Sequence, residues 1–176
     1  TAVGYACLGA NTTGTSNTAV GRTALESNTT GSQNTAVGLG ALDDNNADSN
    51  TAVGYLALNL NTTGTQNTAV GQEAMQNNTT GQYNTAFGAR TFEANTTGSA
   101  NTAIGQFALP SNTTASNNTA LGYSAFMLNT TAANGTAIGY SCLSANTTGS
   151  FNTGVGYRVL ISNTTGFDNT AIGADA

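Results

Sequence analysis

The stretch that decides the fold runs from Asn17 to Gln33 and reads NTAVGRTALESNTTGSQ. It is 17 residues long, and the next residue, Asn34, begins the same pattern again. The opening block NTAVG, or a close variant, starts at 17, 34, 50, 67, 84, 101, 118, 135, 152 and 169, and a copy at Thr1 lacks only its Asn. A short period of this kind is typical of a solenoid, in which each repeat forms one coil and stacks on the next.

Glycine occupies one place in every repeat. Counting the opening Asn as position 1, position 5 is glycine in all eleven copies. This recurrence predicts a bend that needs either a positive φ or a close approach of two backbones. The predicted bend residues are Gly4, Gly21, Gly38, Gly54, Gly71, Gly88, Gly105, Gly122, Gly139, Gly156 and Gly173.

Two short apolar steps in each repeat resemble strands. The first is T-A-V at positions 2 to 4, and the second surrounds A-L at positions 8 and 9, as in Ala24-Leu25. Glycine and asparagine recur between them and favour turns, and no helical period survives. The predicted fold is therefore all-β, a parallel β-solenoid or β-roll of about ten 17-residue coils. We expect residues 1–176 to form a single repeat domain with an irregular coil at 43–49.

Neighbouring residues in a strand face opposite sides, so each step places a small side chain on one side and a large one on the other. Two packings follow. Either the Val and Leu columns fill the interior and the Ala columns face water, or the Ala columns line a narrow interior and the Val and Leu columns face outward. We expect the second packing. It requires partner chains, because an apolar stripe of ten coils is too large for a monomer.

The composition is polar but nearly uncharged. Only 6% of the residues are charged, the net charge is −5, and three arginines cannot form a nucleic-acid footprint. No apolar run approaches the roughly 20 residues of a membrane span. The chain starts at the second position of one repeat and stops early in another, so we expect an internal fragment of a longer fibre.

No residues suggest catalysis, a cofactor or a metal. The chain has no His, and its eight carboxylates fall at scattered repeat positions. Asp43, Asp44 and Asp48 cluster where one coil is a residue short, and a calcium site is conceivable there, but a solvated irregular turn is the favoured interpretation. Cys7 and Cys142 lie eight coils apart, roughly 38 Å at the usual strand spacing, and are interpreted as small packed residues.

A second asparagine, at position 12, is usually followed by Thr-Thr and matches the N-glycan acceptor pattern. Glycosylation would coat one edge of the rod and make a glycosylated sheath filament. The alternative, which we favour, is a ladder of stacked amides and hydroxyls that bond coil to coil. The candidate acceptors are Asn11, Asn28, Asn61, Asn78, Asn95, Asn112, Asn129, Asn146 and Asn163.

The core N-T-A-V-G-x-x-A-L resembles the head repeats of trimeric autotransporter adhesins and related repeats of phage and bacterial tail fibres. Asn101-Thr102-Ala103-Ile104-Gly105, with Ala108, shows the match, which extends over the whole chain. The resemblance implies a left-handed parallel β-roll, three chains packed side by side, and a rigid adhesive stalk or head. The expected function is a structural or adhesive fibre segment without catalysis, located outside the cell, on the cell surface or on a virion. Expected partners are further copies of the chain, and surface glycans or a host receptor.

Ice binding is a further alternative, suggested by the low charge and the threonine columns. Such surfaces need threonines on alternate residues, whereas the two threonines of N-T-T are adjacent and face different sides.

Five tyrosines share position 6, namely Tyr5, Tyr55, Tyr123, Tyr140 and Tyr157. Exposed aromatic rings can stack on sugars. Because other residue types interrupt this column, we interpret it as ordinary surface variation.

Overall fold

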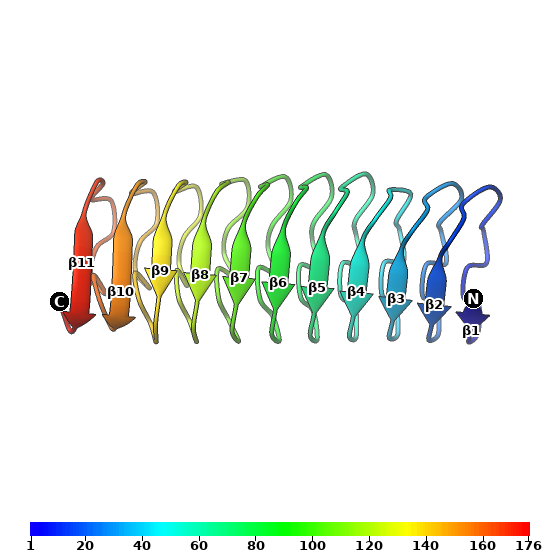
Figure 1. Cartoon of the computed structure of the whole chain (residues 1–176), viewed down its shortest axis with the longest axis horizontal. Helices are drawn as coiled ribbons and strands as arrows, with labels where there is room; N and C mark the ends of the chain where they lie inside the picture. Colours follow the sequence, from blue (N-terminus) through cyan, green and yellow to red (C-terminus); the bar gives the residue numbers. More distant parts are fainter.

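The computed structural model describes all 176 residues and shows a stack of coils with one short strand in each (Figure 1). The strands are β1 Ala2–Val3, β2 Thr18–Val20, β3 Thr35–Val37, β4 Thr51–Val53, β5 Thr68–Val70, β6 Thr85–Phe87, β7 Thr102–Ile104, β8 Thr119–Leu121, β9 Thr136–Ile138, β10 Thr153–Tyr157 and β11 Thr170–Ala174. They form a single eleven-stranded sheet in sequence order. The prediction of an all-β parallel solenoid is confirmed.

Neighbouring strands pair in parallel along the whole sheet, and equivalent repeat positions face one another. Thr68 pairs with Thr85, and Ala69 pairs with Ala86. The register holds across the coil that is one residue short, where Ala36 still pairs with Ala52. Each strand therefore places position 3 inside and positions 2 and 4 outside, because the side chains of a strand alternate.

The second apolar step is not a strand, which corrects the prediction of two strand-like pieces in each coil. Its residues lie in left-handed conformations: Thr23 has a φ of 55° and Leu25 a φ of 53°. L-amino acids other than glycine rarely adopt this conformation. Hydrogen bonds between coils hold it, for example from Leu25 N–H to the Ala41 carbonyl at 3.1 Å. Positions 7 to 9 thus form a tight turn instead of an extended segment.

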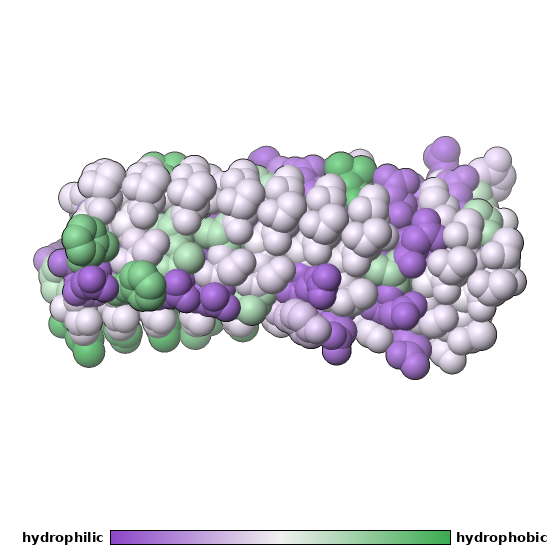
Figure 2. All heavy atoms as spheres, turned by 90° about the horizontal axis from the view of Figure 1, so that it is seen from above, coloured by the Kyte–Doolittle hydropathy of each residue, from purple (hydrophilic) through white to green (hydrophobic).

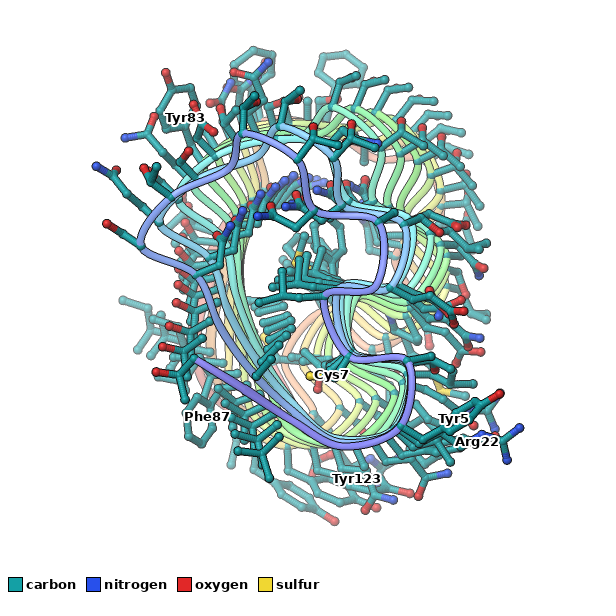
Figure 3. All side chains as sticks on the ribbon, turned by 90° about the vertical axis from the view of Figure 1, so that its right-hand side faces the viewer. Tyr5, Cys7, Arg22, Tyr83, Phe87 and Tyr123 are labelled. Atoms are coloured by element: carbon teal, nitrogen blue, oxygen red, sulfur yellow. The ribbon has the colours of Figure 1, made fainter.

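This turn also overturns both predicted packings. Ala24 and Leu25 are adjacent, yet both are fully buried, because consecutive turn residues need not face opposite sides. The interior combines the Ala column of position 3 with the small column of position 8 and the Leu, Met or Phe column of position 9. Only the apolar column of position 4 lies outside. Figure 3 shows this cross-section, with Cys7 pointing inward and Phe87, Tyr123 and Tyr83 pointing outward.

The bend at position 5 is confirmed for both predicted reasons. All eleven glycines have a φ between 121° and 144°, a region that side chains avoid. A Cβ atom on Gly21 would also collide with the backbone carbonyl of Gly38 in the next coil. Glycine at position 15 has no such φ, and Ala115 and Ala132 replace it there in buried positions. A Cβ at Gly81 would also crowd the Gly98 carbonyl, but Ala115 and Ala132 show that this site can adjust, so the bend at position 5 has the stricter requirement for glycine.

Two pairs of irregular residues inside the stack compensate for each other in volume. Gly154 replaces an alanine of the strand column, and Cys142 replaces an alanine of the position-8 column in the preceding coil. A Cβ on Gly154 would lie 2.6 Å from the Cys142 sulfur, so the thiol fills the space that the glycine leaves. Gly135 in the same way leaves room for the Phe126 ring, whose Cζ would lie 2.5 Å from a Cβ there. At these two places a smaller residue thus offsets a larger neighbour.

Candidate functional site

The asparagines of position 12 form a continuous ladder inside the stack, here called the asparagine ladder. Asn95 shows the repeating geometry. Its side-chain N–H₂ donates to Asn78 Oδ1 at 2.7 Å and to the Gly98 carbonyl at 3.0 Å. Each amide thus links its own coil to the preceding one. The predicted ladder of stacked amides is confirmed, and it satisfies polar groups that would otherwise be costly to bury.

The opening asparagine of position 1 forms a second buried column. Asn67 Nδ2 donates to the Gly81 carbonyl at 2.8 Å, and Asn67 Oδ1 accepts the backbone N–H of Asn84 at 3.0 Å. Gly135 is the one residue that lacks this side chain, and Asn152 of the next coil donates to the Gly149 carbonyl in its place, at 2.9 Å. Both asparagine columns therefore act as internal connections between coils.

The candidate glycan acceptors are the asparagines of this ladder. Seven of the nine have no exposed surface, and only Asn11 and Asn163, in the terminal coils, reach solvent. Glycosylation of these residues stays a prediction. A glycan on any of the seven buried amides would replace one of its two N–H hydrogens and would have no room inside the stack, so modification there is incompatible with this packing.

The outward side of the eleven strands carries two regular columns, here called the sheet face. Position 2 is threonine in all eleven copies, and position 4 is always Val, Ile, Leu or Phe. Figure 2 shows the hydrophobic part of this face along the lower left edge, toward the C-terminus. No charged residue occupies either position. Most of these side chains are β-branched and stiff at χ1, so the sheet face is a rigid array of methyl and hydroxyl groups.

Aromatic rings stack along part of position 6 and its neighbour, forming what we call the aromatic ladder. It consists of Phe107, Tyr123, Tyr140 and Tyr157. The rings of Tyr123 and Tyr140 stack with centroids 5.5 Å apart, and those of Tyr140 and Tyr157 stack at 5.4 Å. Phe107 meets Tyr123 edge to face. Tyr5, Tyr55 and Tyr83 have no aromatic neighbour of this kind, so the tyrosines fall into two classes.

The predicted acidic cluster does not come together as a group. Asp48 Oδ1 accepts the backbone N–H of Ser32 at 2.7 Å, which makes it part of a turn. Asp43 lies against Glu26 of the preceding coil and against Asp44. Burial, followed by the charges of Glu26 and Asp44, raises the pKa of Asp43 to about 6. No group of three potential metal ligands is present.

The two cysteines lie in separate coils, as the repeat predicts, and both are free thiols. Cys7 donates to the Ala19 carbonyl at 3.1 Å. Burial raises the pKa of the Cys142 thiol, which disfavours the reactive thiolate.

No pocket indents the surface. No helix in the structure has the length and hydropathy that crossing a membrane requires. A scan against protein-family models, a search of curated proteins and a search of solved structures found no match for this chain. The geometry of the chain itself therefore carries the functional argument.

Two features were missed at the sequence level. The threonine column of the sheet face was not predicted, although T-A-V already contains the alternation of a strand and its Val column was expected to face outward. The aromatic ladder was not predicted, because other residue types interrupt position 6 over the chain as a whole. Its signal was the tyrosine run in three successive coils, at 123, 140 and 157.

Proposed function

We propose that this chain is a stiff, passive rod segment of a longer extracellular, cell-surface or virion fibre. The observation that supports this most is the unbroken register of the eleven-stranded sheet. Stacking at about 4.8 Å per coil gives a rod roughly 50 Å long. Each coil contacts its neighbours through backbone bonds and both asparagine columns, so bending the rod would break several interactions at once.

The proposed assembly is a left-handed β-roll in a side-by-side homotrimer. The argument for partner chains depends on the exposed residues of position 4 alone, because the Leu column of position 9 lies inside the coil. Val53 is 36% exposed, Ile104 37% and Leu121 42%, and equivalent residues continue along the whole rod. A stripe of this length exceeds the patches that monomers usually expose. Two further copies, packed coil against coil, would cover it. Surface glycans or a host receptor are the proposed ligands of the assembled fibre.

The native mass of the chain in solution tests this assembly. A trimer has three times the 17.5 kDa mass of one chain. The variant Ile104→Asp places a charge in the centre of the sheet face and is expected to dissociate the trimer. Thr97→Asp places the same charge on an exposed side chain of the N-T-T turn and should leave the trimer intact. A monomeric wild-type chain at high concentration would refute the trimer.

Ice binding is the second candidate function, and one observation favours it. Thr102 and Ile104 are two residues apart and point the same way, so the sheet face presents threonine and an apolar residue alternately along each strand. Strand spacing repeats this pair about every 4.8 Å. A rigid, flat and uncharged array of this kind loses little entropy when it binds a solid lattice. Because a trimer would cover the same face, the two functions are alternatives.

Thermal hysteresis measures this activity directly. Phe87 interrupts the array, since it is 53% exposed where Val53 is 36% exposed. The variant Phe87→Val flattens the face and should increase hysteresis, whereas Thr102→Tyr should abolish it. Thr97→Tyr serves as the matched control. Absence of hysteresis in the wild-type chain and in Phe87→Val at high protein concentration would refute this candidate.

A further inference from the structure

We propose that the aromatic ladder is a site of oxidative cross-linking, at which a peroxidase-class oxidant joins tyrosines of successive coils. This inference goes beyond the rod function and does not depend on the oligomeric state. It starts from the position of three tyrosines. Tyr123, Tyr140 and Tyr157 occupy the same place in consecutive coils, and the backbones of those coils are hydrogen-bonded to one another. Their rings are therefore held together without any need for diffusion.

The stacked rings are close enough to react with each other. Centroids lie 5.4 and 5.5 Å apart, and the ring planes are inclined by only 14° and 11°. The side chains are 45% to 50% exposed, so modest rotations about their side-chain bonds can bring ring carbons into contact. The same exposure lets an oxidant or a small radical carrier reach the phenols. Tyr123 and Tyr157 are two coils apart, roughly 10 Å, so Tyr140 is needed in every link.

The geometry argues against the alternative that this ladder binds sugars. A sugar ring stacks on a free aromatic face. In the ladder, the inner faces of the tyrosines cover one another, and Arg158 lies over the Tyr157 ring, 5.9 Å from its centroid. Arg90 lies 5.7 Å from the centroid of Phe107 at the other end. What remains open to solvent is the row of ring edges and hydroxyl groups, which is the part of a tyrosine that oxidation uses.

The chemistry balances with hydrogen peroxide as the oxidant and a haem peroxidase as its catalyst. Each of two phenols gives up one electron and one proton and becomes a phenoxyl radical, and the peroxide leaves as two waters. The spin of a phenoxyl is shared with the ortho carbons, so adjacent radicals join through a new ortho carbon–carbon bond. Each coupled carbon then loses its hydrogen as a proton while its oxygen regains one, which restores both aromatic rings. The product has two hydrogens fewer than the separate tyrosines.

Oxidation of the native chain with peroxidase and peroxide, at two protein concentrations tenfold apart, tests the proposal. Under denaturing conditions we expect a product with the mass of one chain less two hydrogens, in a yield that dilution does not change. Peptide mapping should pair Tyr140 with Tyr123 or Tyr157. A mixture of ¹⁵N-labelled and unlabelled chains identifies links between chains of an oligomer, because such links contain both isotopes.

The variant Tyr140→Phe keeps the ring stack and removes the shared phenol. It should lower the yield of links within a chain at least tenfold, and Tyr55→Phe, at an isolated tyrosine of the same repeat position, should leave the yield unchanged. Links that form only between chains, or an unchanged yield in Tyr140→Phe, would overturn the proposal. The dilution experiment uses the wild-type chain, so it tests for links within one chain even if a variant folds poorly.

Discussion

The regular coils and the short coil of residues 34–49 form their hydrogen bonds to neighbouring coils in different ways. In a regular coil, Asn78 Nδ2 reaches Asn61 Oδ1 at 2.7 Å, and the backbone of the N-T-T turn bonds to the next turn. The short coil lacks one turn residue, and the asparagine ladder breaks there. Asn45 donates only to the Ala47 carbonyl, and Asn28 Oδ1, on the preceding coil, is reached by no donor of the chain.

In the short coil Asn46 Oδ1 takes the place of a backbone carbonyl, and Asp48 supplies the side-chain oxygen that serine supplies in several regular coils. Asn46 Oδ1 accepts the backbone N–H of Thr29 at 2.7 Å, and Asp48 Oδ1 accepts that of Ser32 at 2.7 Å. The strands on either side stay in register. The difference teaches that the strand, the glycine bend and the inner columns define the fold. The N-T-T turn can lose its second threonine, a backbone donor in regular coils, while the strands on both sides stay in register.

The largest effect is expected at the bend that both kinds of coil share. Gly71→Ala introduces a methyl group against the backbone of Gly88, at a φ of 135°. We expect a loss of more than about 3 kcal/mol, or local unfolding of the adjoining coils, measured by hydrogen exchange and by urea unfolding. Gly81→Ala is the control at a glycine without a positive φ. A Cβ there would also lie 2.4 Å from the Gly98 carbonyl, but Ala115 and Ala132 occupy this repeat position in other coils, so we expect a smaller loss than for Gly71→Ala. Equal costs would show that the bend is not special.

Deleting Thr80 from a regular coil should imitate the short coil without its compensating side chains. The Thr80 N–H bonds to the Thr96 carbonyl at 3.0 Å, and the turn on each side would lose partners. A loss of about 2–4 kcal/mol in the free energy of unfolding is expected. Adding Thr79→Asn and Gln82→Asp to the deletion supplies the two oxygens of the short coil and should recover roughly half of that loss. No recovery would mean that these oxygens do not stabilise the native short coil.

The reverse experiment repairs the short coil. A threonine inserted between Asn46 and Ala47 restores the 17-residue period and should let Asn45 donate to Asn28 Oδ1. We expect a gain of about 1–2 kcal/mol, because a buried acceptor without a partner would be satisfied. The midpoint of urea unfolding measures the gain. The same insertion between Thr80 and Gly81, in a regular coil, should destabilise the chain, and a gain there would contradict the explanation.

The smallest effect concerns the pH dependence of the short coil. The pKa of Asp43 is raised from 3.8 to about 6, so the folded state binds its proton more tightly than the unfolded state. Stability should therefore fall as pH rises through the window between these values. Because the group is partly exposed, we expect a change of only about 1 kcal/mol. Asp43→Asn should stabilise the chain at pH 7 and remove this part of the pH dependence. If the free energies of unfolding of the wild type and Asp43→Asn differ by the same amount from pH 4 to pH 7, Asp43 does not cause this pH dependence.

The sequence was sufficient for the parts of the fold that glycine, asparagine and strand alternation determine. The strand at Thr68–Val70, the bend at Gly71 and the amides stacked at Asn78 and Asn95 were each predictable from residue chemistry repeated at a fixed interval. The shortened turn at 43–49 was predicted in the same way and is observed. Its side-chain oxygens could not be assigned, because they depend on which backbone groups the missing residue leaves without partners.

The turn at Leu25 was not predictable from its own residues. Ala-Leu favours a helix or a strand, and nothing in a leucine suggests a φ of 53°. Contacts between stacked coils impose this conformation, which burial of the Leu25 side chain then stabilises. The inside and outside of the coil were consequently assigned wrongly for the Leu column. The direction of the Val column was correct, since it lies on a real strand, where alternation alone decides it.

The glycine bend has a consequence for how such a chain can change in length. The N–H of each bend donates to the position-4 carbonyl of the preceding coil, as Gly38 does to Val20 at 2.8 Å, and the next coil repeats this bond, so the two ends of a coil match each other. An in-frame duplication or loss of one whole 17-residue unit therefore creates no new kind of junction. Genes that encode this architecture can lengthen or shorten by whole units while the backbone hydrogen bonds between coils are kept.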